Sequence, residues 1–198
     1  MSKADLVLSL SKKQIKTKFR LAGHNLENTR EKDDFYPTPP LATNKLLEVE
    51  KFDGNIWECA CGDGAISEIL INNNYEVYSS DLVDRGYGDV NKDFLLSNHI
   101  ADNIITNPPF KLSLEFVYKA LELSKNKVAF LLRITFLEGV ARQKMFLETP
   151  LENVYVFSRR ITFVNPNSNK KTHGGGMLSF AWFVWNKKYR GKPMLNWI

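Results

Sequence analysis

The stretch Asp102–Phe110, with the sequence Asp-Asn-Ile-Ile-Thr-Asn-Pro-Pro-Phe, constrains the fold more than any other part of the chain. Ile104 and Ile105 are β-branched and are typical of a strand that is covered on both faces. The two prolines that follow cannot continue a strand, because proline lacks an amide donor and has a fixed φ. The chain must leave the sheet here. Asn107 and Phe110 are then left at the strand's carboxyl end, where open α/β sheets bind their ligands.

A glycine turn lies upstream, between a predicted strand and a predicted helix. Residues 55–60 form a short apolar segment that carries one carboxylate, Glu58, and Cys61-Gly62-Asp63-Gly64 follows before a helix predicted over 65–73. Strand, glycine turn and helix form the opening of a doubly wound fold. A second strand, predicted over 76–80, ends in Asp81. A carboxylate at this distance from the turn can accept hydrogen bonds from both hydroxyls of a ribose.

The residues of the turn discriminate between cofactors. A dinucleotide site uses Gly-x-Gly-x-x-Gly, with helix amides aimed at a pyrophosphate. Here Ser67 stands at the position of the third glycine, and Glu58 and Asp63 place negative charge where phosphate would lie. This disfavours NAD and FAD. It favours a cofactor with no phosphate and a positive centre, S-adenosylmethionine, whose approach to the backbone still requires glycine.

The remainder of the chain alternates between helices and strands until two strands follow one another near the end. Helices are predicted over residues 41–52, 112–124 and 140–147. Strands are predicted over residues 127–132, 154–157 and 179–185. We therefore expect an α/β, Rossmann-like fold with a mostly parallel seven-stranded sheet and an antiparallel last strand. Residues 1–34 are predicted to form a basic helix or arm plus linker, and residues 35–198 a single domain.

Composition narrows the class of protein. The chain has 198 residues, 43% of them hydrophobic and 25% charged, which is ordinary for a soluble globular domain. It has no apolar run of about 20 residues and no secretory signal at its start, so we expect a cytoplasmic protein without a membrane partner. Cys59 and Cys61 are too close for an easy disulfide and lack further Cys or His at zinc-site spacing. We expect both to be core residues and predict no metal site.

Charge is distributed unevenly along the chain. The net charge is +5 and the pI about 9.1, yet no acidic residue follows Glu152, whereas eight Lys or Arg do. A second basic run extends from Lys12 to Arg20. Two separate basic patches would attract a phosphate backbone, although each alone is also typical of a solvated surface.

Together these motifs resemble class I S-adenosylmethionine-dependent methyltransferases, in particular compact phage-type DNA N6-adenine amino-methyltransferases. The resemblance covers residues 35–185 and is carried by Phe35–Pro40, Glu58–Gly64, Asp81, Asp93-Phe94 and Asn107–Phe110. It implies that S-adenosylmethionine binds with its methionine end, ribose and adenine on different motifs. The implied cofactor-binding residues are Tyr36, Thr38, Pro39, Glu58, Gly62, Gly64, Asp81, Leu82, Asp93 and Phe94. For the last two, a helix cap and a core aromatic are the alternative roles.

The same resemblance implies that Asn107, Pro108, Pro109 and Phe110 form the pocket for the target base. An exocyclic amine is a poor nucleophile, but a sulfonium is a good electrophile, so placement can supply most of the catalysis. The Asn107 side-chain oxygen and the Pro108 carbonyl would accept the amine's two hydrogens. Phe110 would stack on the base, a contact worth ~1–3 kcal/mol that offsets part of the cost of flipping it from a duplex.

The resemblance leaves the substrate polymer open. DNA methyltransferases of restriction systems usually carry a target-recognition domain, and only about 13 residues follow the strand predicted to be the last. The candidates for nucleic-acid contacts are Arg159, Arg160, Lys170, Lys171 and His173, and a solvated hairpin is the alternative for all of them. We expect the partner to be DNA with a flipped adenine. Methylation of RNA at adenine N6 or guanine N2, methylation of protein glutamine, and a non-catalytic nucleic-acid-binding fold are the alternatives.

Overall fold

A computed structural model describes residues 35, 37–163 and 178–198. The compact unit that contains them extends from Phe35 to Ile198. The predicted arm and linker, residues 1–34, lie outside the described residues, as do four of the predicted site residues, Tyr36, Lys170, Lys171 and His173.

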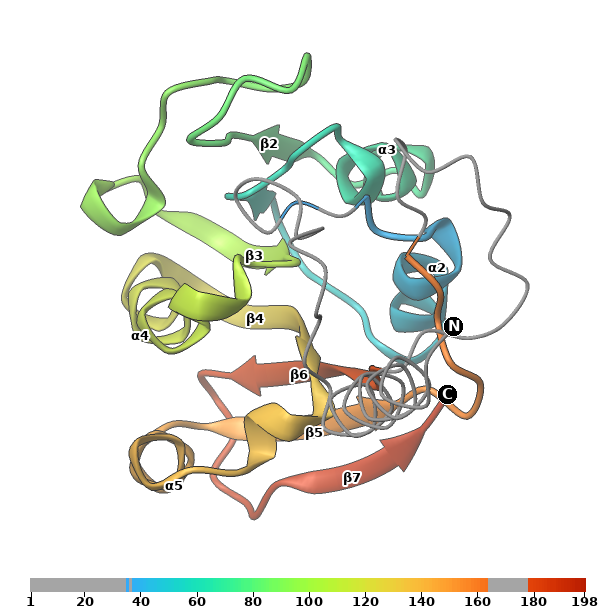
Figure 1. The fold of residues 1–198 in the computed structure, drawn as a ribbon. Coiled ribbons are helices and arrows are strands. Elements are labelled where there is room, and N and C mark those ends of the chain that lie inside the picture. The colour runs from blue at the N-terminus through green and yellow to red at the C-terminus, as the bar shows by residue number, and fades with distance from the viewer. Residues whose placement is uncertain (1–34, 36, 164–177) are drawn as a thin grey trace, which may run out of the picture. The chain divides into compact units, whose positions relative to one another are not determined.

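The described part of the chain folds into one seven-stranded sheet with helices on both faces (Figure 1). The strands are β1 (Ile56–Glu58), β2 (Val77–Ser79), β3 (Ala101–Thr106), β4 (Ser124–Arg133), β5 (Leu151–Val156), β6 (Phe180–Asn186) and β7 (Met194–Trp197). The α-helices are α2 (Pro40–Val49), α3 (Ala65–Asn72), α4 (Ser113–Leu123) and α5 (Val140–Glu148). Short 3₁₀ helices are η2 (Phe94–Leu96), η3 (Phe110–Leu112) and η4 (Ile134–Leu137).

The sheet has the strand order β2-β1-β3-β4-β6-β5-β7. β6 is antiparallel to both neighbours, and the other pairs are parallel. This confirms the expected mostly parallel α/β sheet, and β6 is the strand that was predicted over 179–185 to be antiparallel. The structure adds β7, which pairs with β5 at the edge of the sheet. Its sequence, Met-Leu-Asn-Trp, carries no pattern of alternating burial, since its side chains are exposed or half-buried.

Two apolar clusters among the described residues cover the two faces of the sheet. Alternate residues of β4 belong to different clusters, because successive side chains of a strand point to opposite faces. Val128, Phe130 and Leu132 pack with residues of α4 and α5, whereas Ala129 and Leu131 pack with residues of α2 and α3. Burial of β4 on both faces explains why residues 128–132 form a continuous apolar run.

Parallel pairing brings three strand ends together. β1 lies between β2 and β3, with Ile56 opposite both Val77 and Asn103. The carboxyl ends of these strands therefore face the same edge of the sheet, where the glycine turn, Asp81 and Asn107 follow them. Helix α2 is held near the same sheet by the Trp182 indole, whose Nε1 donates to the Ala42 carbonyl at 2.8 Å.

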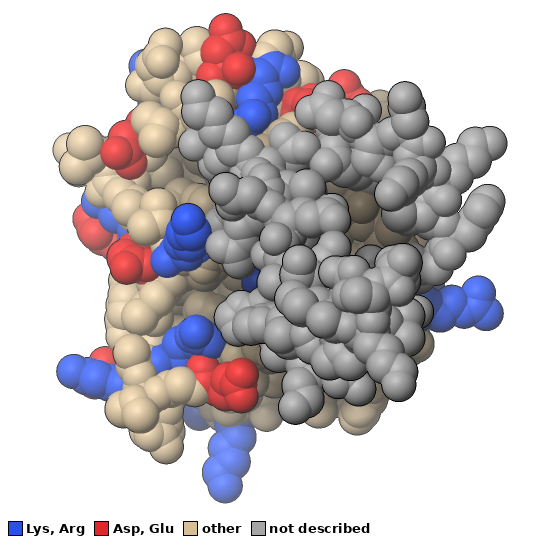
Figure 2. Space-filling view, in the orientation of Figure 1, with Lys and Arg blue, Asp and Glu red and all other residues tan. Residues whose placement is uncertain are grey.

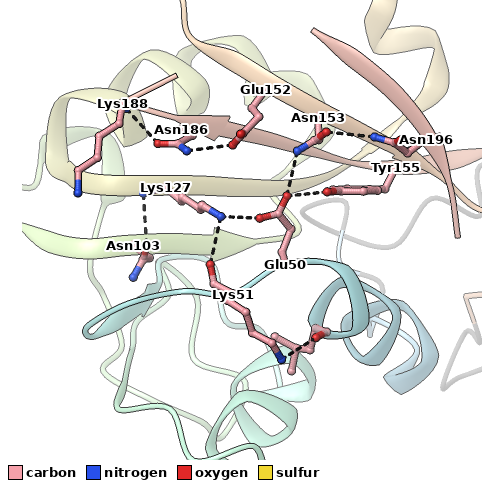
Figure 3. Close-up of polar contacts among 11 residues, drawn as sticks. Glu50, Lys51, Asn103, Lys127, Glu152, Asn153, Tyr155, Asn186, Lys188 and Asn196 are labelled. Atoms are coloured by element: carbon pink, nitrogen blue, oxygen red, sulfur yellow. Dashed lines mark hydrogen bonds and ion pairs between the residues drawn. The ribbon is translucent and has the colours of Figure 1, made fainter. Parts of the chain in front are cut away.

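A buried polar network anchors the end of α2 (Figure 3). Glu50, the residue after the helix, is 5% exposed. Its carboxylate accepts from Lys127 Nζ at 2.6 Å, from the Tyr155 hydroxyl at 2.7 Å and from Asn153 Nδ2 at 3.1 Å. Burial and the neighbouring carboxylate raise the pKa of Tyr155, so this phenol stays a donor. Helix α2 is thus tied to β4 and β5 as well as to the apolar core.

Across the described residues, none of the helices combines the length and apolar character needed to span a bilayer.

Candidate functional site

The glycine turn between β1 and α3 depends on glycine at two positions. Gly62 and Gly64 have φ values of +56° and +86°, which L side chains rarely adopt. A Cβ on Gly64 would lie 2.5 Å from the Tyr87 ring, and one on Gly62 would overlap the Phe35 ring. Two aromatic side chains therefore lie directly on this turn, and neither was predicted as a site residue. Gly62 and Gly64 are themselves buried, with these rings packed against them.

Asp81, the acid predicted to bind a ribose, lies against the turn. One carboxylate oxygen accepts from the Gly62 amide and the other from the Val83 amide, both at 2.8 Å. These bonds hold the carboxylate in one orientation. Each oxygen retains a further lone pair, so Asp81 can still accept hydrogen bonds from two hydroxyls of a ligand.

Glu58 is buried beneath the turn rather than lying on its surface. The side chain is 1% exposed and accepts a hydrogen bond from Ser67, whose hydroxyl also lies 2.6 Å from that of Ser79. Burial raises the pKa of the Glu58 carboxyl well above its usual value, and the negative charges of Asp63 and Asp81 act in the same direction. Sequence reasoning missed Ser67 as a partner, although its place at the third-glycine position marked it.

The side-chain nitrogen of Asn107 makes a hydrogen bond, whereas its side-chain oxygen has no partner in the described part of the chain. Its Nδ2 donates to Thr38 Oγ1 at 3.1 Å, which joins two motifs that are far apart in the sequence. Its Oδ1 is buried and has no hydrogen-bond partner among the described residues. A buried acceptor left unpaired is costly and uncommon. A donor on a ligand would relieve that cost.

Phe110 packs in a small aromatic and cationic group. Its ring centroid lies 5.7 Å from that of Phe180, and the Arg133 guanidinium carbon lies 4.5 Å from it. Arg133 and Phe180 pair across β4 and β6, so both belong to the edge of the sheet at which the two prolines end β3. Sequence reasoning missed both residues. The available signal was their position at the ends of two predicted strands.

The two prolines set the direction of the chain after β3. Pro108 is buried, and the Pro109 carbonyl accepts from the Leu112 amide at 3.0 Å, which starts η3. Pro39 has a similar place before α2, where its carbonyl accepts from the Ala42 amide at 2.8 Å. Each proline segment thus leads directly into a helix, which limits how far the intervening side chains can move.

The residues expected to hold an adenine lie on two adjacent segments, since the Lys92 amide donates to the Asp81 carbonyl at 3.0 Å. Leu82 is 58% exposed. Asp93 caps η2 by accepting from the Leu95 amide at 2.9 Å. Phe94 is buried, with its ring 5.1 Å from Trp57 and 4.8 Å from Phe116. Asp93 and Phe94 therefore have the cap and core positions that were their alternative roles, and their contacts with an adenine stay predictions.

The described basic residues after Glu152 lie at opposite ends of the strands. Arg159 and Arg160 are exposed and follow the carboxyl end of β5. Four others, Lys187, Lys188, Arg190 and Lys192, lie between β6 and β7. Trp185, near the end of β6, pairs with Leu151, the first residue of β5. The second group, which follows β6, therefore lies at the opposite end of the strands from Arg159 and Arg160. On the face shown in Figure 2, basic and acidic side chains of the described residues are interspersed.

Neither cysteine is placed for redox or metal chemistry. Cys59 and Cys61 are both buried and free, as expected for core residues. Burial raises the pKa of both thiols, that of Cys61 to about 12, so both stay protonated at neutral pH. Within the described ranges, no group of His, Cys, Asp and Glu is arranged to hold a metal ion.

Comparison with known proteins identifies the fold. Neither a protein-family model nor a curated protein matches this chain. Among solved structures, one described as the modification subunit of a type I restriction enzyme from Vibrio vulnificus has a TM-score of 0.58 at 12% identity. The match covers 100% of this chain and 53% of the subunit, so this chain spans about half of that protein.

Two further solved structures have the same fold. One described as an RNA methyltransferase from Pyrococcus horikoshii has a TM-score of 0.61 at 18% identity, over 87% of this chain and 98% of its own. Magnesium protoporphyrin IX methyltransferase from Synechocystis, solved with bound SAM, has a TM-score of 0.50 at 11% identity, over 75% and 79%. This chain therefore has the Rossmann-like fold of S-adenosylmethionine-dependent methyltransferases.

Proposed function

We propose that this protein transfers a methyl group from S-adenosylmethionine to the exocyclic N6 amine of adenine in DNA. The observation that carries the proposal is the buried, unpaired Oδ1 of Asn107 at the carboxyl end of β3. An acceptor in this position suits a ligand that brings a donor, and a primary amine on a planar base brings two.

The residues around the glycine turn fit the cofactor. S-adenosylmethionine supplies a methyl group bound to a positively charged sulfur, and its methionine end carries an ammonium. Asp63 and Asp81 place negative charge at the turn, and burial together with these two charges raises the pKa of Glu58. A cation there would stabilise the ionised acids, whereas a phosphate would be repelled.

The cofactor contacts follow from this placement. Gly62 and Gly64 would allow close approach of the methionine end, Asp81 would accept from the ribose, and Pro39 lies on the segment beside the target pocket. Tyr36, Leu82, Asp93 and Phe94 are assigned by the family resemblance. Glu58 lies beneath the turn, where a bound cation would favour its ionised form.

Catalysis would depend on placement of the amine. The Asn107 Oδ1 and the Pro108 carbonyl would accept the two hydrogens of the amine, direct its lone pair toward the methyl group and stabilise the positive charge that develops on nitrogen. The bond from the methyl group to sulfur would break as the bond to nitrogen forms, S-adenosylhomocysteine would leave, and the positively charged, acidic nitrogen would lose one proton to solvent, so no strong base is required. Phe110, backed by Phe180 and Arg133, would provide the ring against which the base stacks.

Two observations support a nucleic acid as the substrate. The described chain after Glu152 carries basic but no acidic residues, and Arg159 and Arg160 are exposed after β5. The match to a restriction modification subunit supports DNA. The match to an RNA methyltransferase supports RNA as the second candidate. We favour DNA because the Asn-Pro-Pro-Phe sequence resembles the corresponding motif of DNA N6-adenine methyltransferases.

Labelling tests the proposal directly. The protein would be incubated with tritiated S-adenosylmethionine and unmethylated DNA, RNA or protein in parallel, followed by nucleoside and amino-acid analysis. We expect label in N6-methyldeoxyadenosine. Label in N6-methyladenosine or N2-methylguanosine would replace DNA with RNA, and label in glutamine would replace it with protein. Absence of cofactor binding in calorimetry would instead indicate a non-catalytic fold.

Asn107→Ala provides the matched control for this assay. The variant should bind S-adenosylmethionine as the wild type does, because the proposal assigns the unpaired oxygen to the target amine rather than to the cofactor. Transfer should fall by at least about 100-fold, as for the loss of one well-placed polar group at a reacting centre. An equal loss of cofactor affinity would place Asn107 in the cofactor site instead.

A further inference from the structure

We infer that Thr38 is a positioning residue for the target amine, through a hydrogen bond that holds the Asn107 carboxamide in place and pairs its nitrogen when its oxygen faces the amine. The inference rests on the proposed function, because it concerns how that amine is held. The family resemblance assigned Thr38 to the cofactor alone. In the structure its hydroxyl meets the side chain of the proposed catalytic residue at 3.1 Å.

The orientation of the carboxamide decides what it can do. Its oxygen is an acceptor and its nitrogen carries two donors, so only one of the two orientations presents an acceptor to an amine. With Nδ2 donating to Thr38, Oδ1 is the atom left buried and unpaired. A hydroxyl can also donate, so it tolerates either orientation, and the two hydrogens of the target amine select the one that presents Oδ1. Thr38 then removes the cost of leaving the amide nitrogen unpaired in that state.

Thr38 is itself held in place. It is 6% exposed and lies between Pro37 and Pro39, whose rings fix φ on either side. Helix α2 begins directly afterwards, and Trp182 donates to the Ala42 carbonyl in its first turn. The hydroxyl is therefore ordered before a substrate arrives, so its bond to Asn107 costs little entropy. One hydrogen bond thus connects the segment that leads into α2 with the amine pocket at the end of β3.

Three variants separate this role from a general effect on the protein. Thr38→Val keeps the branched shape but removes the hydroxyl, Thr38→Ser keeps the hydroxyl, and Thr43→Val is the matched control. Thr43 is also buried next to the same segment, but its Oγ1 has no partner among the described residues, so its loss breaks no hydrogen bond there.

The kinetic prediction is a loss in kcat without a loss in cofactor affinity. With the polymer identified by labelling, Thr38→Val should lower kcat by roughly 3- to 10-fold, the effect of one lost hydrogen bond. Its S-adenosylmethionine Kd, measured by calorimetry, should be unchanged. Thr38→Ser and Thr43→Val should retain the wild-type kcat. A parallel loss of cofactor affinity in Thr38→Val, an unchanged kcat, or an equal loss of kcat in Thr43→Val would overturn the assignment.

A second readout does not require activity. In protein labelled with ¹⁵N-asparagine, the Asn107 side-chain NH₂ signal is identified by its absence from Asn107→Ala. Thr38→Val should shift this signal and speed its hydrogen exchange, and Thr43→Val should leave it in place. An unshifted signal in Thr38→Val would refute the hydrogen bond. If the wild type shows this bond but transfers no methyl group, the proposed function fails while the contact between Thr38 and Asn107 stands.

Discussion

Glu58 is a carboxylic acid in a site that disfavours its charge. It is almost completely buried, and Asp63 and Asp81 lie near enough to raise its pKa further. Between the usual carboxyl pKa and the raised one, the folded protein binds a proton that the unfolded chain has released. The free energy of unfolding must therefore fall as pH rises through this range.

Glu58→Gln tests this linkage at a single residue. Glutamine is similar in shape and stays neutral, so it keeps a partner for Ser67 without any proton to lose. We expect the melting temperature of the wild type to fall relative to that of Glu58→Gln as pH is raised from 4.5 toward neutrality, with both proteins free of cofactor. The pH-dependent difference between the two melting temperatures should be smallest at the lowest pH, where Glu58 and the glutamine that replaces it are both neutral. Parallel stability curves over this range would contradict a raised pKa at Glu58.

At the scale of elements, the glycine turn is constrained by its backbone and by the ring that covers it. Gly64 and Gly86 have nearly equal φ values, +86° and +82°, but only Gly64 has a neighbour in the way of a side chain. Alanine at either position should lower the free energy of unfolding by about 1–2 kcal/mol because of the left-handed backbone alone. These two glycines therefore allow the steric effect to be separated from the backbone effect.

Gly64→Ala should be more destabilising than Gly86→Ala and should also weaken cofactor binding. A Cβ at residue 64 would lie 2.5 Å from Tyr87, so the ring and the turn must move apart. At residue 86 nothing lies within 4 Å. Urea denaturation and calorimetric titration with S-adenosylmethionine measure the two effects. Equal losses of stability, or unchanged cofactor affinity in Gly64→Ala, would refute the proposed packing on the turn.

Helix α2 ends in one buried and one exposed acidic residue. Glu50 connects the helix to β4 and β5, whereas Glu48 pairs with Lys45 on the exposed side, with 57% of its side chain accessible. Breaking a buried ion pair from one side usually costs 3–5 kcal/mol. Lys127 retains partial access to solvent, which lowers that cost.

Glu50→Gln should therefore lower the free energy of unfolding by about 2–3 kcal/mol, because Lys127 loses its counter-charge. Glu48→Gln should change it by less than about 0.5 kcal/mol, as is usual for exposed pairs. Chemical denaturation of both variants gives the comparison. If both variants changed the free energy of unfolding by a similarly small amount, the apolar core alone would hold the end of the helix.

At the scale of the whole molecule, the basic residues that follow Glu152 form separate groups. Arg159 and Arg160 follow β5, while Lys188 and Arg190 lie beyond β6, at the opposite end of the strands. The seven residues of β6 connect the two ends of the strands, so the two basic groups are separated by roughly 20 Å along the strand direction. A nucleic acid that presents a base to Asn107 would be nearer to the end that carries the arginines.

Salt dependence of binding distinguishes the two groups. Replacing both Arg159 and Arg160 by serine should reduce the slope of log K against log salt by about 2, as for the loss of two phosphate contacts. Replacing Lys188 and Arg190 by serine makes the same change in net charge and should leave the slope unchanged. If the second pair changes the slope equally, overall charge rather than position determines the affinity for the polymer.

The main elements of the fold could be predicted because each has a local signal. Residues 65–73 begin after two glycines and have helical periodicity, and α3 covers Ala65–Asn72. Residues 128–132 are an apolar run of strand length, and they lie in β4, which is buried on both faces. β7 could not be predicted, because its exposed side chains show no periodicity and its pairing with β5 is non-local.

The sequence alone determined the glycine turn, Asp81 and the Asn-Pro-Pro-Phe ending, since glycine, proline and strand-terminal polar residues act on the backbone locally. Tertiary structure decided how these parts meet. Thr38 became a partner of Asn107, Glu58 turned beneath the glycine turn toward Ser67, and Arg133 came to lie over Phe110. These contacts join residues from separate elements, which strand order together with the packing of α2 and α3 brings within reach. Backbone propensity is read along the chain, whereas the direction of a side chain is set by what packs against it.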